Sequence, residues 1–123
     1  MDKEHEQILL NVVRGAVRNA VNGQSPTVPS SEEAELVATC GCFVTLKNRG
    51  RLRGCIGQFI SDKPLIELVS EMAVSSATRD PRFLADPIGP AELDSLDIEI
   101  SVLSPLKKTE EPLSWPDPQK LYH

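Results

Sequence analysis

Aromatic side chains are scarce in this sequence, at 4% of its 123 residues, and long apolar runs are absent. With so few rings, the core must be built from Leu, Ile and Val. No stretch approaches the roughly 20 apolar residues that span a bilayer. The polar start, Met1 to Glu6, lacks the charged-then-apolar order of a signal peptide. We therefore expect a cytoplasmic protein that has no membrane contact.

Cysteine and positive charge are also in short supply. The three cysteines are Cys40, Cys42 and Cys55, an odd number that argues against a disulfide framework. No Cys-x-x-Cys pair and no phosphate-binding or dinucleotide-binding glycine motif occurs, so we expect no metal and no cofactor. The net charge of −5 is opposite to that of most nucleic-acid binders, which makes a nucleic-acid partner the least favoured.

The patterns that are present predict one α+β domain over residues 1–123. Apolar residues recur at helical spacing over 4–22 and again over 62–78, where Asp62 is a suitable N-cap. Strict alternation over 96–102 predicts a half-buried strand. Short helical turns are expected near 31–36 and 88–93. The predicted fold is a mainly antiparallel sheet packed against two principal helices.

A β-hairpin is predicted at residues 40–58, where two strands flank the three-residue loop 48–50. We expect Lys47 to face Arg51 and Val44 to face Gly54, which collects the aliphatic residues on one side. The other side should then carry Phe43, Thr45, Lys47, Arg51, Arg53 and Cys55.

Cys55 is the candidate catalytic residue of this hairpin. A thiolate is a strong nucleophile, and a neighbouring cation such as Arg53 lowers the pKa of a thiol. Gly54 and Gly57 carry no side chains, so a ligand could approach the strand closely. The alternative is that Cys55 is a small buried apolar residue and the glycines allow tight packing.

The base that a Cys55 nucleophile requires is not settled by the sequence. His5 and His123 lie near the two ends of the chain. Asp80 and Glu99 are the other candidates, and Glu99 qualifies only if its strand packs beside the hairpin.

Arg53 is the candidate anion-binding residue, because a guanidinium holds phosphate or carboxylate with two hydrogen bonds. A buried ion pair is the alternative role. Asp80 and Arg82 follow the second helix and either close a pocket over the hairpin or simply end that helix. The predicted ligand-binding set is Arg53, Gly54, Gly57, Asp80, Arg82 and Glu99.

Three segments together resemble the AMMECR domain family. They are Leu52-Arg53-Gly54-Cys55-Ile56-Gly57, Asp80-Pro81-Arg82-Phe83, and the run 98–105 with sequence Ile-Glu-Ile-Ser-Val-Leu-Ser-Pro. The resemblance covers roughly residues 5–118 and implies an α+β domain without an established activity. Because the family domain continues past the third segment, it also implies that part of the usual sheet is missing or that the chain is C-terminally truncated.

Two functions remain open at this point. One is a small-ligand or anion site, catalytic if the Cys55 thiol reacts. The other is a non-enzymatic protein–protein interaction module, which binds a partner on the Cys55 face or adds a strand at an open sheet edge. A second copy of the chain is one candidate for that strand.

Overall fold

A computed structural model describes residues 1–103 of the chain. Helix α1 (Lys3–Val21) is followed by the short α2 (Ala34–Val37), and strands β1 (Gly41–Asn48) and β2 (Arg51–Gln58) form a hairpin. Helix α3 (Leu65–Thr78) comes next. Two 3₁₀ segments, η1 (Pro81–Phe83) and η2 (Pro90–Ser95), lead into strand β3 (Leu96–Leu103). The predicted α+β class and antiparallel sheet are confirmed.

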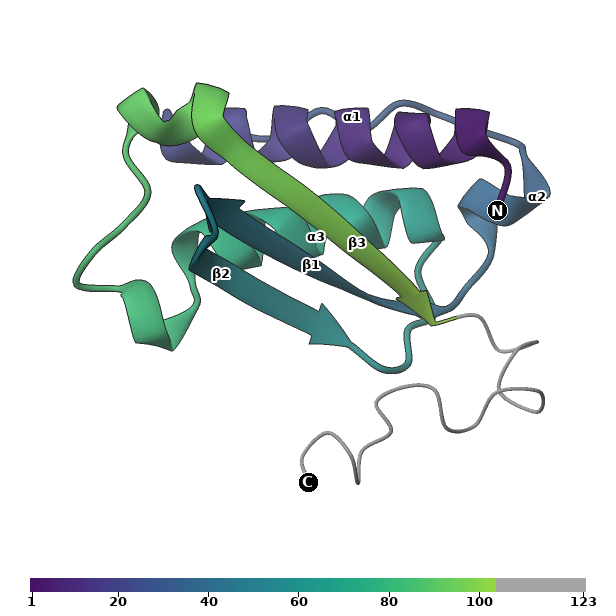
Figure 1. Ribbon diagram of the computed structural model, residues 1–123. Coiled ribbons are helices and arrows are strands. Elements are labelled where there is room, and N and C mark those ends of the chain that lie inside the picture. Colours follow the sequence, from purple (N-terminus) through teal and green to yellow (C-terminus); the bar gives the residue numbers. More distant parts are fainter. Residues whose placement is uncertain (104–123) are drawn as a thin grey trace.

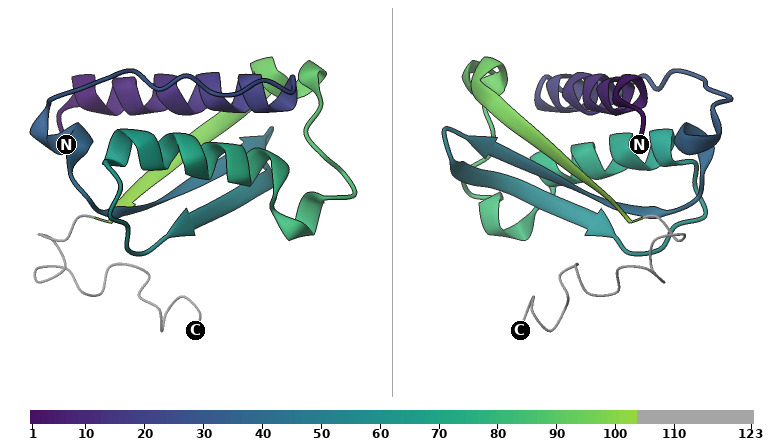
Figure 2. Two further views of the ribbon diagram at one scale, coloured as in Figure 1. Left: turned by 180° about the vertical axis from the view of Figure 1, so that it is seen from behind. Right: turned by 45° about the vertical axis from the view of Figure 1, so that its right-hand side comes forward.

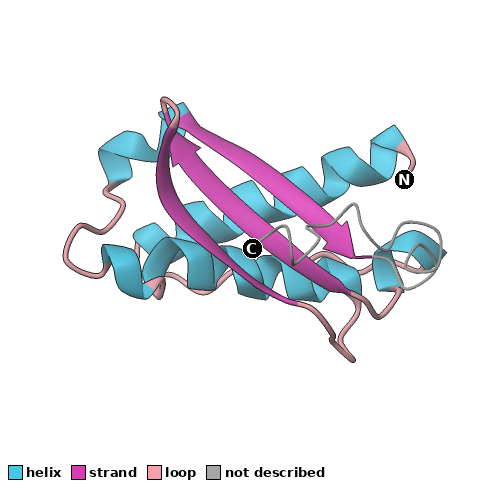
Figure 3. Ribbon diagram, turned by 60° about the horizontal axis from the view of Figure 1, so that its bottom comes forward, coloured by secondary structure: helices cyan, strands magenta, loops and turns pink. Residues whose placement is uncertain are grey.

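The molecule has two layers, a three-stranded sheet and a helical layer (Figure 1). The strand order is β2-β1-β3, and both neighbours of β1 run antiparallel to it. Helices α1 and α3 lie on the same side of the sheet, as Figure 2 shows from two further directions. No helix of residues 1–103 crosses the opposite side, which faces the viewer in Figure 3.

Both principal helices form where apolar spacing predicted them. The side chain of Asp2 caps α1 by accepting from the Glu4 N–H at 2.8 Å, and the stripe from Leu9 to Val17 is buried. The prediction for the start of α3 was wrong, because Pro64 and not Asp62 occupies the N-cap position. None of the helices among residues 1–103 has both the length and the apolar content needed to cross a bilayer.

The predicted hairpin register was wrong near the turn. The loop has two residues, Arg49 and Gly50, with φ of 54° and 84°, as in the type I′ turns that match strand twist. Asn48 therefore faces Arg51, and Lys47 faces Leu52. The next pair is Leu46 with Gly54, which leaves Arg53 as the extra residue of a β-bulge.

The two sides of the sheet follow from this register. The covered face lies under the helices and includes Cys42, Val44 and Leu46, all fully buried, as expected for the apolar side of the hairpin. We call the other side the open face. Its residues are Phe43, Thr45, Lys47, Leu52, Cys55, Gly57, Asp97, Glu99 and Ser101. Leu52 thus lies on the opposite side from the one predicted.

Candidate functional site

The bulge at Arg53 turns its side chain away from the open face into a buried ion pair. Its side chain is 1% exposed. Nε and Nη2 donate to the two carboxylate oxygens of Glu92 at 2.9 and 3.0 Å, and Nη1 donates to Asp86 at 3.3 Å. Asn48 also donates to Glu92, at 3.0 Å. Of the two roles open for Arg53, the structure shows the buried pair.

Glu92 holds this arrangement together from η2. Its carboxylate also accepts the Gly89 N–H at 3.2 Å, so four donors converge on it. The Arg53 guanidinium, more than any other contact, lowers the pKa of Glu92 to about 2. The carboxylate in turn raises the pKa of Arg53. Sequence reasoning missed Glu92, although Pro90 followed by Glu92 is a helix-start pattern that would have placed it in a first turn.

Asp80 and Arg82 hold the outer edge of β2 at Cys55. The Cys55 N–H donates to Asp80 Oδ2 at 3.0 Å, and Arg82 Nη2 donates to the Cys55 carbonyl at 3.3 Å. Arg82 also binds the Asp80 carboxylate through Nε at 2.9 Å and Nη2 at 2.6 Å. Chiefly through Arg82, the pKa of Asp80 falls to about 2. The two side chains thus occupy the backbone groups that a further strand would need at this position.

Phe83 lies between the two clusters. Its ring centroid is 5.9 Å from the Arg53 guanidinium carbon and 5.5 Å from that of Arg82. Both distances suit cation–π attraction. The Asp-Pro-Arg-Phe segment therefore links the bulge to the β2 edge.

The glycines of the signature run are needed by the fold. A Cβ on Gly54 would lie 2.0 Å from the Ser76 carbonyl oxygen, and one on Gly57 would lie 2.4 Å from both Phe43 Cγ and the Cys42 oxygen. The Ser76 hydroxyl accepts from the Ile56 N–H and donates to the Val44 carbonyl, which ties α3 to the hairpin. Sequence reasoning missed Ser76, since a serine inside a helix gives no sign of its partner.

Cys55 differs from the other two cysteines. Cys40 and Cys42 are buried, and burial raises the pKa of both thiols, that of Cys42 to about 12. The Cys55 thiol is half-buried on the open face, 3.2 Å from Thr45 Oγ1. Thr45 pairs with Cys55 on one side and with Glu99 on the other.

The predicted site residues therefore fall into separate groups. Cys55, Gly57 and Glu99 share the open face, where Lys47 Nζ lies 3.5 Å from Glu99. Arg53 contacts Glu92 and Asp86. Asp80 and Arg82 bind each other, and their contacts with Cys55 are to its backbone and not to its thiol. His5 contacts Glu35 and Glu33 beside α2, and no histidine of residues 1–103 contacts Cys55. His123 lies outside the described residues.

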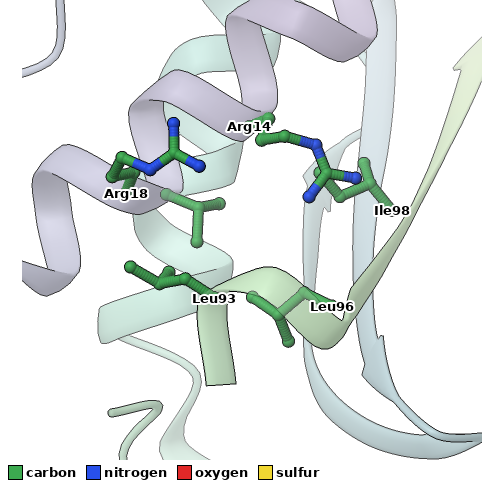
Figure 4. A pocket seen from close by; sticks show the side chains of 6 residues that line it. Arg14, Arg18, Leu93, Leu96 and Ile98 are labelled. Carbon is green, nitrogen blue, oxygen red and sulfur yellow. The ribbon is translucent and has the colours of Figure 1, made fainter. Parts of the chain in front are cut away.

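A small hollow lies between α1 and the start of β3, where Arg14 and Arg18 extend above Leu93 and Leu96 (Figure 4). Its volume is about 10 Å³, enough for about one water molecule. Residues 1–103 also contain no cluster of three or more His, Cys, Asp or Glu side chains suited to a metal ion.

The fold and the signature cluster define an α+β domain with one covered sheet face and an Arg-Glu pair beneath the hairpin. The AMMECR1 family model matches residues 10–120, and the chain belongs to that family. A Methanothermobacter thermautotrophicus protein is 37% identical over 119 residues, covering 94% of this chain and 61% of the relative. A Thermococcus gammatolerans protein is 40% identical over 116 residues, covering 89% and 55%.

A solved structure confirms the fold. The uncharacterized protein PH0010 from Pyrococcus horikoshii is 36% identical, with a TM-score of 0.66 over 76% of this chain and 48% of that chain. The chain thus spans between about half and three-fifths of the length of these three relatives. None of their names states an activity.

Proposed function

We propose that this domain is an interaction module that binds a further polypeptide element on the open face of its sheet. One observation carries the proposal: both principal helices cover the same side, and no helix of residues 1–103 covers the other. The relatives contain a large additional portion that this chain does not match. The occupant of the open face is, in this proposal, a polypeptide that corresponds to this additional portion.

The side chains on the open face suit such an occupant. Phe43, Thr45 and Cys55 are half-buried, and the Phe43 ring packs edge-to-face on Phe59 at 5.2 Å. Phe59 and the adjacent Ile60 are 63% and 85% exposed, which is typical of an apolar contact surface. Asp97 and Glu99 are exposed on β3. The occupant should place apolar residues over β1 and β2 and basic residues along β3.

The alternative anion site is less well supported by the same geometry. The guanidinium of Arg53 is already bound by two carboxylates, and Asp80 is bound by Arg82. An anion would have to displace Glu92 from a guanidinium that is almost fully buried, and breaking such a pair is costly.

The test uses the unmatched portion of the Methanothermobacter relative as the probe. It is co-expressed with this chain as a separate polypeptide, and complex formation is measured by co-purification. Native iodoacetamide labelling then reports on the open face through Cys55, because Cys40 and Cys42 are buried. We expect a stable complex in which labelling of Cys55 slows at least tenfold.

Charge reversal supplies the matched control. Asp97→Lys together with Glu99→Lys should weaken the complex, whereas Glu32→Lys, an exposed acid away from the sheet, should not. The proposal is wrong if no complex forms, or if it forms while Cys55 labels at its original rate. Concentration-dependent self-association with protection of Cys55 would instead identify a second copy as the occupant.

A second candidate function, thiol chemistry at Cys55, has one specific observation in its favour. Cys55 is the single cysteine that is not buried, and its thiol lies 3.2 Å from the Thr45 hydroxyl. A reactive thiol should be alkylated at pH 7 much faster than free cysteine and should slow in Thr45→Val. An alkylation rate at or below that of free cysteine would exclude this role.

A further inference from the structure

A groove on the helical side of the molecule is separate from every residue discussed above. It lies between α3 and the connection 22–33, which runs back along the helical layer from α1 to α2 (Figure 2). Its volume is about 480 Å³, within the range of roughly 300–1,000 Å³ typical of ligand pockets. Pro26, Val28 and Pro29 form one wall.

The α3 side of the groove carries charges of both signs. Glu67, Ser70, Glu71 and Val74 line it at helical spacing, and Arg79 lines it beyond the end of the helix. Glu71 is paired with Lys63. Neither Glu67 nor Arg79 has an ion-pair partner among residues 1–103. Twelve residues separate these two positions, which corresponds to about 18 Å along a helix axis.

Ser70 places a hydroxyl group in the wall of the groove. Its side chain lines the groove although the residue is only 2% exposed. Within the described part of the chain its hydroxyl has no hydrogen-bond partner, unlike that of Ser76 six residues later. Because this side chain lines the groove, its hydroxyl is available to a hydrogen-bonding group that lies near the middle of the groove.

We propose that this groove binds a short extended peptide. Its cationic end contacts Glu67, its apolar middle lies on Val28 and Val74, and its carboxylate end contacts Arg79. A peptide amide or carbonyl pairs with the Ser70 hydroxyl. About five extended residues span the required length at roughly 3.3 Å per residue. A simple anion or cation fits less well, because the two unpaired charges have opposite signs and lie far apart.

The probe is a pool of acetylated and amidated pentapeptides with Lys first, Glu last, and mixed Val, Leu, Ala and Pro between them. Binding is followed by amide chemical shifts of the ¹⁵N-labelled chain. We expect saturable shifts at Ser70, Val74 and Arg79 and none at Thr45 or Glu99 on the open face. A matched pool with Lys at both ends should bind at least tenfold more weakly.

Variants separate a binding role from a structural one. Arg79→Gln and Glu67→Gln should each weaken binding about tenfold, and Arg49→Gln, at the hairpin tip, should leave it unchanged. Ser70→Ala should weaken binding while leaving the Tm of the free protein unchanged or higher, since it removes an unpartnered hydroxyl. The proposal is overturned if neither pool shifts the groove resonances at millimolar concentration. Equal binding of both pools, or equal loss in Arg49→Gln, overturns it as well.

Discussion

On the covered face of the sheet, Cys42, Val44 and Leu46 are fully buried beneath the helices, whereas Phe43, Thr45 and Lys47 on the open face of the same strand are half-buried. The signature run contributes to both sides. Arg53 and Gly54 are enclosed by η2 and α3, while Cys55 remains accessible next to Thr45. One short motif thus stabilises the fold with some of its residues and supplies surface chemistry with others.

The largest loss of stability is expected from removing the buried guanidinium of Arg53. Arg53→Met leaves Glu92 without its main partner, and we expect a loss of about 3–5 kcal/mol in the free energy of unfolding, measured with urea. Arg51→Met is the matched control, since Arg51 is exposed on the same strand and contacts the same Asp86. Its cost should stay within about 0.5 kcal/mol. Equal costs for the two variants would contradict a structural role for Arg53.

The second-largest destabilisation is expected from adding a side chain at Gly54. Gly54→Ala forces a methyl group into the Ser76 carbonyl, and we expect about 2–3 kcal/mol of destabilisation in the same urea experiment. Gly15→Ala in α1 meets no atom within 4 Å and should stabilise by up to about 1 kcal/mol. A neutral Gly54→Ala would mean that β2 and α3 are not in close contact in solution.

Acid should weaken the ion pairs of Arg53 and of Asp80 more than the contacts on the open face. The pKa values of Glu92 and Asp80 are lowered to about 2, so their stabilisation is complete above their ordinary values of 4.5 and 3.8 and is lost as pH falls towards 2. We expect roughly 2 kcal/mol from each carboxyl over that range. Thermal unfolding from neutral pH downwards should show a shallower decline in Glu92→Gln than in the wild-type protein.

The smallest change in stability is expected from a substitution on the open face itself. Lys47 and Glu99 are paired there at 3.5 Å, but their side chains are 38% and 62% exposed. Glu99→Gln should therefore change the free energy of unfolding by less than about 0.5 kcal/mol. A larger loss in the isolated chain would show that the pair stabilises the fold and would weaken the case for a free binding surface.

The two sheet edges also differ, and this bears on the predicted homo-oligomer. Asp80 and Arg82 occupy the outer backbone groups of Cys55 on β2. Strand β3 pairs only with β1 among residues 1–103. A strand-swapped or strand-adding dimer therefore remains a prediction for the β3 edge and is disfavoured at the middle of β2.

Local sequence signals were sufficient to predict the principal elements and the family. Helical spacing located α1 and α3, alternation located β3, and the predicted Asn-Arg-Gly loop located the hairpin, although the turn itself has two residues. Each of these signals depends on neighbours in the chain. The same local alternation correctly placed Cys55 opposite the aliphatic side.

The role of Arg53 depends on contacts between elements that are distant in the sequence. A single extra residue in β2 changed the side to which its side chain points, and its partners Glu92 and Asp86 come from a segment more than 30 residues away. The edge contacts of Asp80 and the groove beside Ser70 arise in the same way. Such contacts depend on how separate elements pack in space, and period-2 or period-3.6 patterns along one element contain no information about that.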